Sequence, residues 1–184
     1  ITRFGFDSSR HPPYLPMALG SGSVTPMQMA VGYSVFANGG YRIAPYFIKR
    51  IEDEKGNVLE QFQPITPLNG AKRVIDPRNA FIMTHMMQDV VNYGTAAKAK
   101  QLGRTDLAGK TGTTSNFVDA WFCGFQKDLV TVAWTGYDEP KSLGNNETGG
   151  RIALPIWMDY MGPVLKGVPM AEYKPPNGIL ATKI

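Results

Sequence analysis

The chain has 184 residues, of which 43% are hydrophobic and 18% charged, so it is long enough for one globular domain with a core. The net charge of +4 is spread along the sequence without a basic run, which argues against a nucleic-acid partner. A single cysteine, Cys123, excludes an internal disulfide and is expected in the core, and no apolar run reaches the roughly 18 residues of a membrane span.

Two helices are predicted in the first half of the chain. The first begins at TPMQ (25–28), where Thr25 and Gln28 form a capping box, and ends at NGG (38–40). The second begins at Asp76-Pro77 and ends at Gly94. One face of the first helix contains, at helical spacing, Met27, Ala30, Val31, Ser34 and Val35. The core face of the second is expected to contain Ala80, Met83, Met87, Val90 and Val91.

Strands dominate the middle of the chain. A hairpin is predicted from residues 46–53 and 57–63, and a short helix from residues 95–101. Three further strands, joined by such short links that they must form an antiparallel meander, are predicted at 107–113, 118–125 and 129–137. A last helix, 151–166, completes an α+β domain of residues 1–166, and residues 167–184 are expected to be a linker or tail.

One stretch, AGKTGTT (108–114), indicates chemistry. In a strand, Lys110 and Gly112 face one side, whereas Thr111 and Thr113 face the other. Gly112 lets a ligand backbone approach, Lys110 supplies a cation, and the threonine hydroxyls can donate to a carboxylate. An exposed strand edge can also pair with an extended peptide. Alone, however, the tripeptide KTG favours an ordinary strand or β-turn, since three residues recur by chance.

A nucleotide-binding loop is disfavoured. The pattern G-x-x-x-x-G-K-[ST] needs glycine at position 104, where the chain has Arg104, and Gly103 is one position away. Such a loop also needs a helix after Thr111, whereas Gly112 and a strand pattern follow.

Seven sequence blocks, in order and at sensible spacing, resemble class A penicillin-binding proteins, most closely the 1A type of Gram-negative bacteria. The blocks are ALGSGSVTP (18–26), FANGG (36–40), NYGTA (92–96), LAGKTGTT (107–114), DAWF (119–122), WTGYD (134–138) and TGG (148–150). The resemblance covers residues 1–166. It implies part of the penicillin-binding and serine β-lactamase-like transpeptidase fold, an antiparallel sheet flanked by helices.

The resemblance also implies a function and a site. It implies a peptidoglycan D,D-transpeptidase, a serine acyltransferase that cross-links stem peptides and is the target of β-lactams, in a parent protein that is also a glycosyltransferase. Lys110 would be catalytic, Thr111, Gly112 and Thr113 would bind the substrate, and Thr114, Ser115 and Asn116 would line the cleft. No cofactor and no metal are implied. The parent would lie at the periplasmic face of the inner membrane, held by an N-terminal anchor.

The sequence departs from the family pattern in one respect. None of its seven serines has lysine three residues later or asparagine two residues later, so the S-x-x-K and S-x-N motifs are absent. In the family both precede K-T-G, so they are expected upstream of Ile1, in an N-terminal remainder that partners this chain and completes its sheet. The chain alone is therefore expected to be inactive. Two alternatives stay open: a D,D-carboxypeptidase or serine β-lactamase-like enzyme, and a non-catalytic β-lactam-sensing module.

Overall fold

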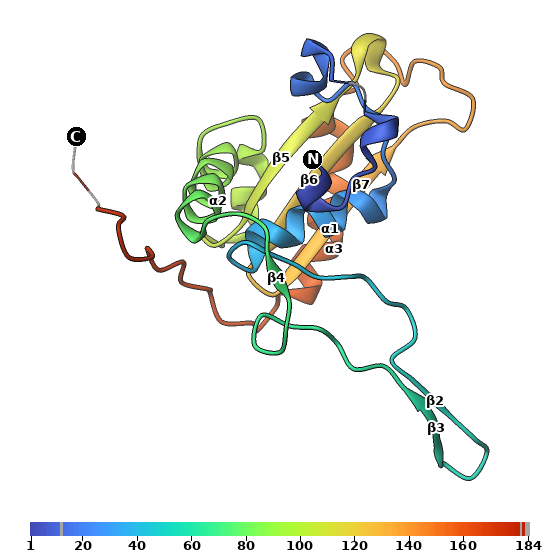
Figure 1. Cartoon of the computed structure of the whole chain (residues 1–184). Coiled ribbons are helices and arrows are strands. Elements are labelled where there is room, and N and C mark those ends of the chain that lie inside the picture. Colours follow the sequence, from blue (N-terminus) through green and yellow to red (C-terminus); the bar gives the residue numbers. More distant parts are fainter. Residues whose placement is uncertain (12, 181, 183–184) are drawn as a thin grey trace.

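The fold is built on a three-stranded antiparallel sheet with helices on both faces. The computed structural model describes residues 1–11, 13–180 and 182. Figure 1 shows the sheet at the centre, with α2 beside β5. In the sheet order β5-β6-β7, the strands are Ala108–Thr113, Ala120–Gln126 and Leu129–Thr135. The α+β prediction and the antiparallel meander are confirmed.

The remaining elements surround this sheet. The α-helices are α1 (Pro26–Ala37), α2 (Pro77–Asn92) and α3 (Leu154–Val164). The short strands are β1 (Tyr41–Arg42), β2 (Arg50–Glu52), β3 (Val58–Gln61) and β4 (Lys72–Arg73). The 3₁₀ helices are η1 (Thr2–Phe4), η2 (Ser8–Arg10), η3 (Leu15–Leu19), η4 (Ala97–Leu102) and η5 (Ser115–Phe117), and a π-helical turn, η6 (Gly149–Ala153), leads into α3.

The start of α1 follows from its first residues. The Gln28 amide donates to the Thr25 hydroxyl at 3.2 Å, and the Thr25 amide donates to the Gln28 side chain at 2.8 Å, which confirms the capping box. Val35 is fully buried, but Met27, predicted on the same face, is 42% exposed. The buried residues of α1 all lie in its second half, so its first turn extends beyond the core.

The second helix shows a similar correction. Its N-cap Asp76 accepts from the Arg78 amide, and Pro77 occupies the first turn, as predicted. The buried stripe runs through Ala80, Thr84, Met87 and Val91, spaced by three and four residues. Met83 is 39% exposed, because the buried face extends past Thr84 toward Gln88, on the side of the helix away from Met83. The expectation that Met83 belongs to the core is wrong.

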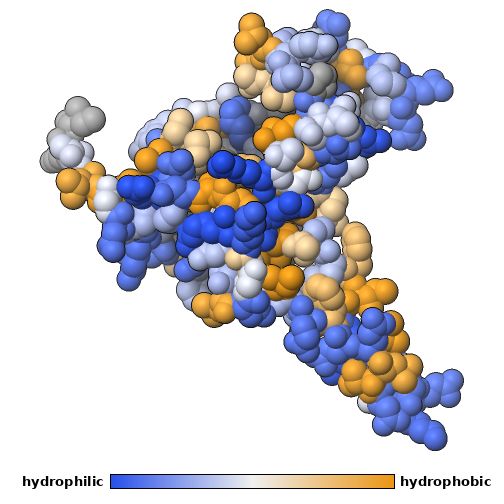
Figure 2. All heavy atoms as spheres, viewed as in Figure 1, coloured by the Kyte–Doolittle hydropathy of each residue, from blue (hydrophilic) through white to orange (hydrophobic). Residues whose placement is uncertain are grey.

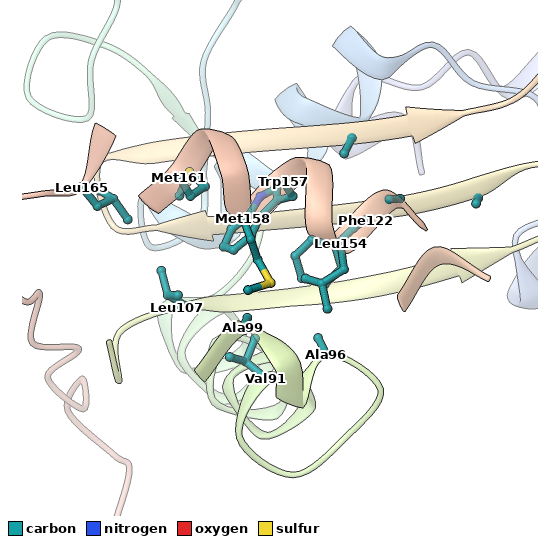
Figure 3. Close-up of a cluster of buried hydrophobic side chains, with 13 residues drawn as sticks. Val91, Ala96, Ala99, Leu107, Phe122, Leu154, Trp157, Met158, Met161 and Leu165 are labelled. Atoms are coloured by element: carbon teal, nitrogen blue, oxygen red, sulfur yellow. The ribbon is translucent and has the colours of Figure 1, made fainter. Parts of the chain in front are cut away.

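The main core lies between the sheet and α3 (Figure 3). Phe122 of β6 meets Trp157 of α3 edge to face, with ring centroids 5.0 Å apart. The Trp157 indole donates to the carbonyl oxygen of Thr131 at 3.1 Å, so its one polar group is satisfied. A second cluster, which includes Phe125 and Ala37, joins the opposite face to α1. Successive strand residues therefore serve opposite layers.

The β2–β3 hairpin and the segment after α3 lie outside this layered body. The hairpin β2–β3 projects away from it (Figure 1) and is shorter than the predicted strands 46–53 and 57–63. Figure 2 shows hydrophobic and hydrophilic side chains intermixed on that projection.

The segment that follows α3 has no regular structure, yet it contacts the body. The Arg104 guanidinium donates to the carbonyl oxygens of Val168 and Pro169, and the Asp106 carboxylate accepts from the Ala171 amide. The linker or tail proposed for 167–184 stays a prediction, and its residues 181, 183 and 184 lie outside the described residues.

Candidate active site at the edge of the sheet

The strand β5 is the outer strand of the three-stranded sheet, so one of its edges has no strand neighbour in the described part of the chain. The ladder with β6 pairs Gly112 with Trp121 and continues to Thr114, whose amide donates to the carbonyl oxygen of Asp119 at 3.0 Å. Bonded and non-bonded pairs alternate in an antiparallel ladder. The backbone N–H and C=O of Thr111 and Thr113 therefore point away from β6, toward the open edge.

Lys110 reaches the same edge. Its side chain is on the face of β5 that also carries its cross-strand partner Cys123. The Lys110 ammonium donates to the carbonyl oxygen of Thr111 at 3.0 Å, which places the charge at the outer edge of the strand. Burial raises the pKa of the Cys123 thiol to about 12, so this neighbour is a neutral thiol and does not compensate the Lys110 charge.

Both threonine side chains lie on the other face and already have partners. The Thr111 and Thr95 hydroxyls are 2.7 Å apart, and the Thr113 hydroxyl accepts from the Gly149 amide at 3.0 Å. The alternation predicted for Lys110 and these threonines is thus present. The two kinds of side chain can act on one ligand only at the strand edge, where both faces meet.

A cavity of about 530 Å³ opens on the threonine face. It is lined by Thr95, Lys98, Thr111, Thr113, Thr148, Gly150 and Arg151. Lys98 and Arg151 bring two cations to this cavity, and sequence reasoning assigned neither of them a role. The blocks NYGTA and TGG contain Thr95 and Thr148, but the sequence alone did not indicate that these residues share a cavity with β5.

Gly149 explains why the TGG block lies so close to the motif. A Cβ on Gly149 would collide with the carbonyl oxygen of Trp121 and would lie 2.5 Å from that of Gly112. The η6 turn therefore packs directly on the Gly112–Trp121 pair of the ladder. One face of Gly112 is covered by this turn, so a ligand can approach it only from the edge or from the Lys110 face.

The three residues after the motif form a tight connection to β6. The Thr114 hydroxyl accepts from the Asp119 amide at 2.7 Å, and the Asp119 carboxylate accepts from the Trp134 indole at 2.9 Å. Asn116 has a positive φ of 59°, a conformation that asparagine tolerates. Ser115 and Asn116 are exposed and follow the end of β5.

Within the described residues, no group of three or more His, Cys, Asp or Glu side chains is arranged to hold a metal ion. No described helix is both long enough and apolar enough to cross a bilayer.

Comparison with known proteins defines the class. The family model of the penicillin-binding protein transpeptidase domain matches residues 13–162, so the chain belongs to the penicillin-binding protein transpeptidase family. The fold agrees, because the chain superimposes on the crystal structure of penicillin-binding protein 1A from Haemophilus influenzae with a TM-score of 0.89 and 32% identity. That match covers 95% of this chain and 31% of the other.

Individual relatives place the chain more closely. It is 52% identical over 181 residues to penicillin-binding protein 1A of Neisseria lactamica, and 41% identical over 233 residues to that of Pseudomonas aeruginosa. The PonA1 protein of Mycobacterium tuberculosis, solved in complex with penicillin V, matches 91% of the chain with a TM-score of 0.74 and 26% identity. The match to the Neisseria lactamica protein includes 98% of this chain but only 23% of the length of that relative.

Proposed function

We propose that this chain forms one wall of a serine acyltransferase site, a D,D-transpeptidase that cross-links peptidoglycan stem peptides and is acylated by β-lactams. The single observation that carries the proposal is an open strand edge that presents both the outward-facing backbone of Thr113 and the Lys110 ammonium, which contacts the Thr111 carbonyl oxygen. A donor and a cation on one open edge suit a carbonyl group that becomes an oxyanion. Membership of the family and the penicillin V complex of PonA1 support this reading.

Each residue has a proposed role. The Thr113 N–H is one donor of the oxyanion hole, and its backbone can pair with an extended stem peptide as an added strand. Lys110 assists proton transfer between catalytic serines. Thr111 and Thr113 bind the substrate carboxylate through their hydroxyl protons. The Thr113 hydroxyl accepts from Gly149 and so keeps its own proton to donate, and the Thr111 proton is free when Thr95 is the donor of their shared hydrogen bond. Gly112 leaves room for the substrate, and Thr114, Ser115 and Asn116 line the groove.

The attacking serine is proposed to come from outside these 184 residues, because no serine here has the S-x-x-K spacing. That serine forms an ester with the acyl group while the leaving amine takes up a proton, and a second amine then releases the acyl group. The same gene product is proposed to carry a glycosyltransferase and a membrane anchor, with this domain in the periplasm. The low coverage of the relatives is compatible with a much longer protein.

The test is the acylation rate of the protein as encoded by its gene, measured with a fluorescent penicillin. Lys110→Ala is expected to slow acylation by about a hundredfold or more, as for loss of a proton-transfer group. Lys110→Arg is expected to recover little, because a planar guanidinium does not replace a compact ammonium. Lys127→Ala, at the exposed turn between β6 and β7, is the matched control.

Wild-type acylation by a folded Lys110→Ala protein would refute the site. A cross-linking assay with stem peptides, run beside an assay for D-alanine release, separates a transpeptidase from a D,D-carboxypeptidase.

A further inference from the structure

A second cavity, of about 750 Å³, lies between the N-terminal turn η1 and the β1–β4 ladder. Four of its lining residues, Arg3, Arg42, Lys72 and Arg73, are cations, and none is acidic. Figure 2 shows a strongly hydrophilic area on this face, between the N-terminus and β4 as located in Figure 1. The cavity is separate from the threonine-lined cavity beside β5, with which it shares no lining residue.

The strand pairing brings like charges together. Arg42 of β1 lies directly opposite Lys72 of β4 in the antiparallel register. Like charges at directly opposed positions destabilise a ladder, and this ladder has only two paired positions. The four ion pairs among the described residues involve other side chains, so none of them offsets this repulsion. The arrangement has a cost in the unliganded protein that a bound anion would remove.

Two of the guanidinium groups, those of Arg42 and Arg73, lie against the protein, although both residues are exposed. A Cβ on Gly5 would lie 2.8 Å from Arg42 Nη2, so the absent side chain leaves the space that the Arg42 guanidinium occupies. Gly5 has a φ of 94°, which glycine adopts readily. Arg73 donates to the Gly39 carbonyl oxygen and the Tyr41 hydroxyl, and stacks on the Tyr41 ring at 4.1 Å. Arg73 thereby anchors the cavity wall.

We propose that this cavity is a binding site for a phosphate-bearing anion. A carboxylate carries a single charge and would leave most of the cluster uncompensated, whereas a phosphate ester carries −1.5 to −2 and a pyrophosphate more. The forked guanidinium groups of Arg3 and Arg42 match phosphate oxygens in pairs, and Lys72 adds a point charge. The phosphate can belong to a soluble ester or to a lipid head group, since the chemistry is the same.

The probes are inorganic pyrophosphate and vesicles that contain phosphatidylglycerol in phosphatidylcholine, with the protein as encoded by its gene. Saturable pyrophosphate binding is expected by calorimetry, with slowed hydrogen exchange in peptides covering 1–5, 41–44 and 70–74. Arg42→Gln and Lys72→Gln are each expected to weaken binding about tenfold, whereas Lys72→Arg retains it. Lys55→Gln, in the turn of the β2–β3 hairpin, is the matched control and is expected to bind as wild type.

A second readout separates a ligand site from a structural role. Without anion, Lys72→Gln is expected to slow hydrogen exchange in β1 and β4 or leave it unchanged, because it removes a like-charge pair. Faster exchange there would mean that Lys72 supports the fold, and would overturn the proposal. Failure of both probes to bind saturably, equal affinity for succinate, or equal weakening by Lys55→Gln would also overturn it. Vesicle binding that depends on Arg42 assigns the phosphate to a lipid head group. Binding of pyrophosphate without any binding of vesicles assigns it to a soluble ester.

Discussion

Glycine at position 149 is the residue on which the geometry of the candidate site depends most directly. Gly149→Ala is expected to lower the free energy of unfolding by about 1–3 kcal/mol, since its Cβ would push against backbone rather than a flexible side chain. Because the η6 turn packs on the Gly112–Trp121 pair, β5 must shift and acylation should slow. Denaturant unfolding and the acylation rate by a fluorescent penicillin measure the two effects.

The control for Gly149→Ala is Gly162→Ala in α3. A Cβ there would meet only the end of the Leu102 side chain, at 3.2 Å, and alanine is the better helix former. Unchanged or higher stability is expected. If both variants behaved alike, the packing of Gly149 on the ladder would not be what matters.

The Arg104–Asp106 ion pair holds the segment after α3 against the sheet and helices of the body. The two side chains are 9% and 1% exposed, and their closest N–O distance is 2.6 Å. Burial raises the pKa of Asp106, but hydrogen bonds from Arg104, Ala171 and Gln126 outweigh it, so the pKa lies below its ordinary value. The pair joins the end of η4, the start of β5 and residues 168–171.

Asp106→Asn is expected to destabilise the fold by about 3–5 kcal/mol, because it leaves the Arg104 charge buried without its partner. Limited proteolysis should then cleave between residues 167 and 174 faster than in the wild type. The control is Asp76→Asn, which keeps an N-cap and loses only an exposed ion pair. Wild-type protease resistance of Asp106→Asn would contradict the role of the pair.

The same pair predicts a pH dependence with a definite sign. A carboxyl whose pKa is lower in the folded state stabilises the fold above the unfolded pKa of about 3.9. That contribution is lost as the pH falls through the lower, folded pKa of Asp106. Proteolysis of the 167–174 segment by an acid protease should therefore accelerate below about pH 4, and Asp106→Asn should remove the dependence.

At the scale of the whole molecule, the 184 residues contain one wall of the proposed site without its nucleophile. The isolated chain is therefore expected to form no covalent adduct with a penicillin, since no serine has the S-x-x-K spacing. Intact-mass spectrometry after incubation with the β-lactam checks this, with the full gene product as the positive control. A stoichiometric adduct on any of the seven serines would overturn the proposed division of the site.

The features that depend only on neighbouring residues could be predicted from the amino-acid sequence. The capping box at Thr25 and Gln28, the Pro77 start of α2, and the alternation of Lys110 with Thr111 follow from local geometry, and the structure confirms them. Local patterns were less reliable at the margins of the core. Met27 and Met83 have the right chemistry for burial, but only the packing of each helix decides which residues face the core.

Which distant residues lie beside the KTGT motif could be seen only in the folded chain. Gly149 meets Thr113 across 36 residues of sequence, and Thr95 meets Thr111 across 16. Likewise, Arg42 and Lys72 are far apart in the chain, and only strand pairing sets their charges side by side. Such contacts have no local signature, because they depend on how separate elements pack and not on the propensity of any one of them.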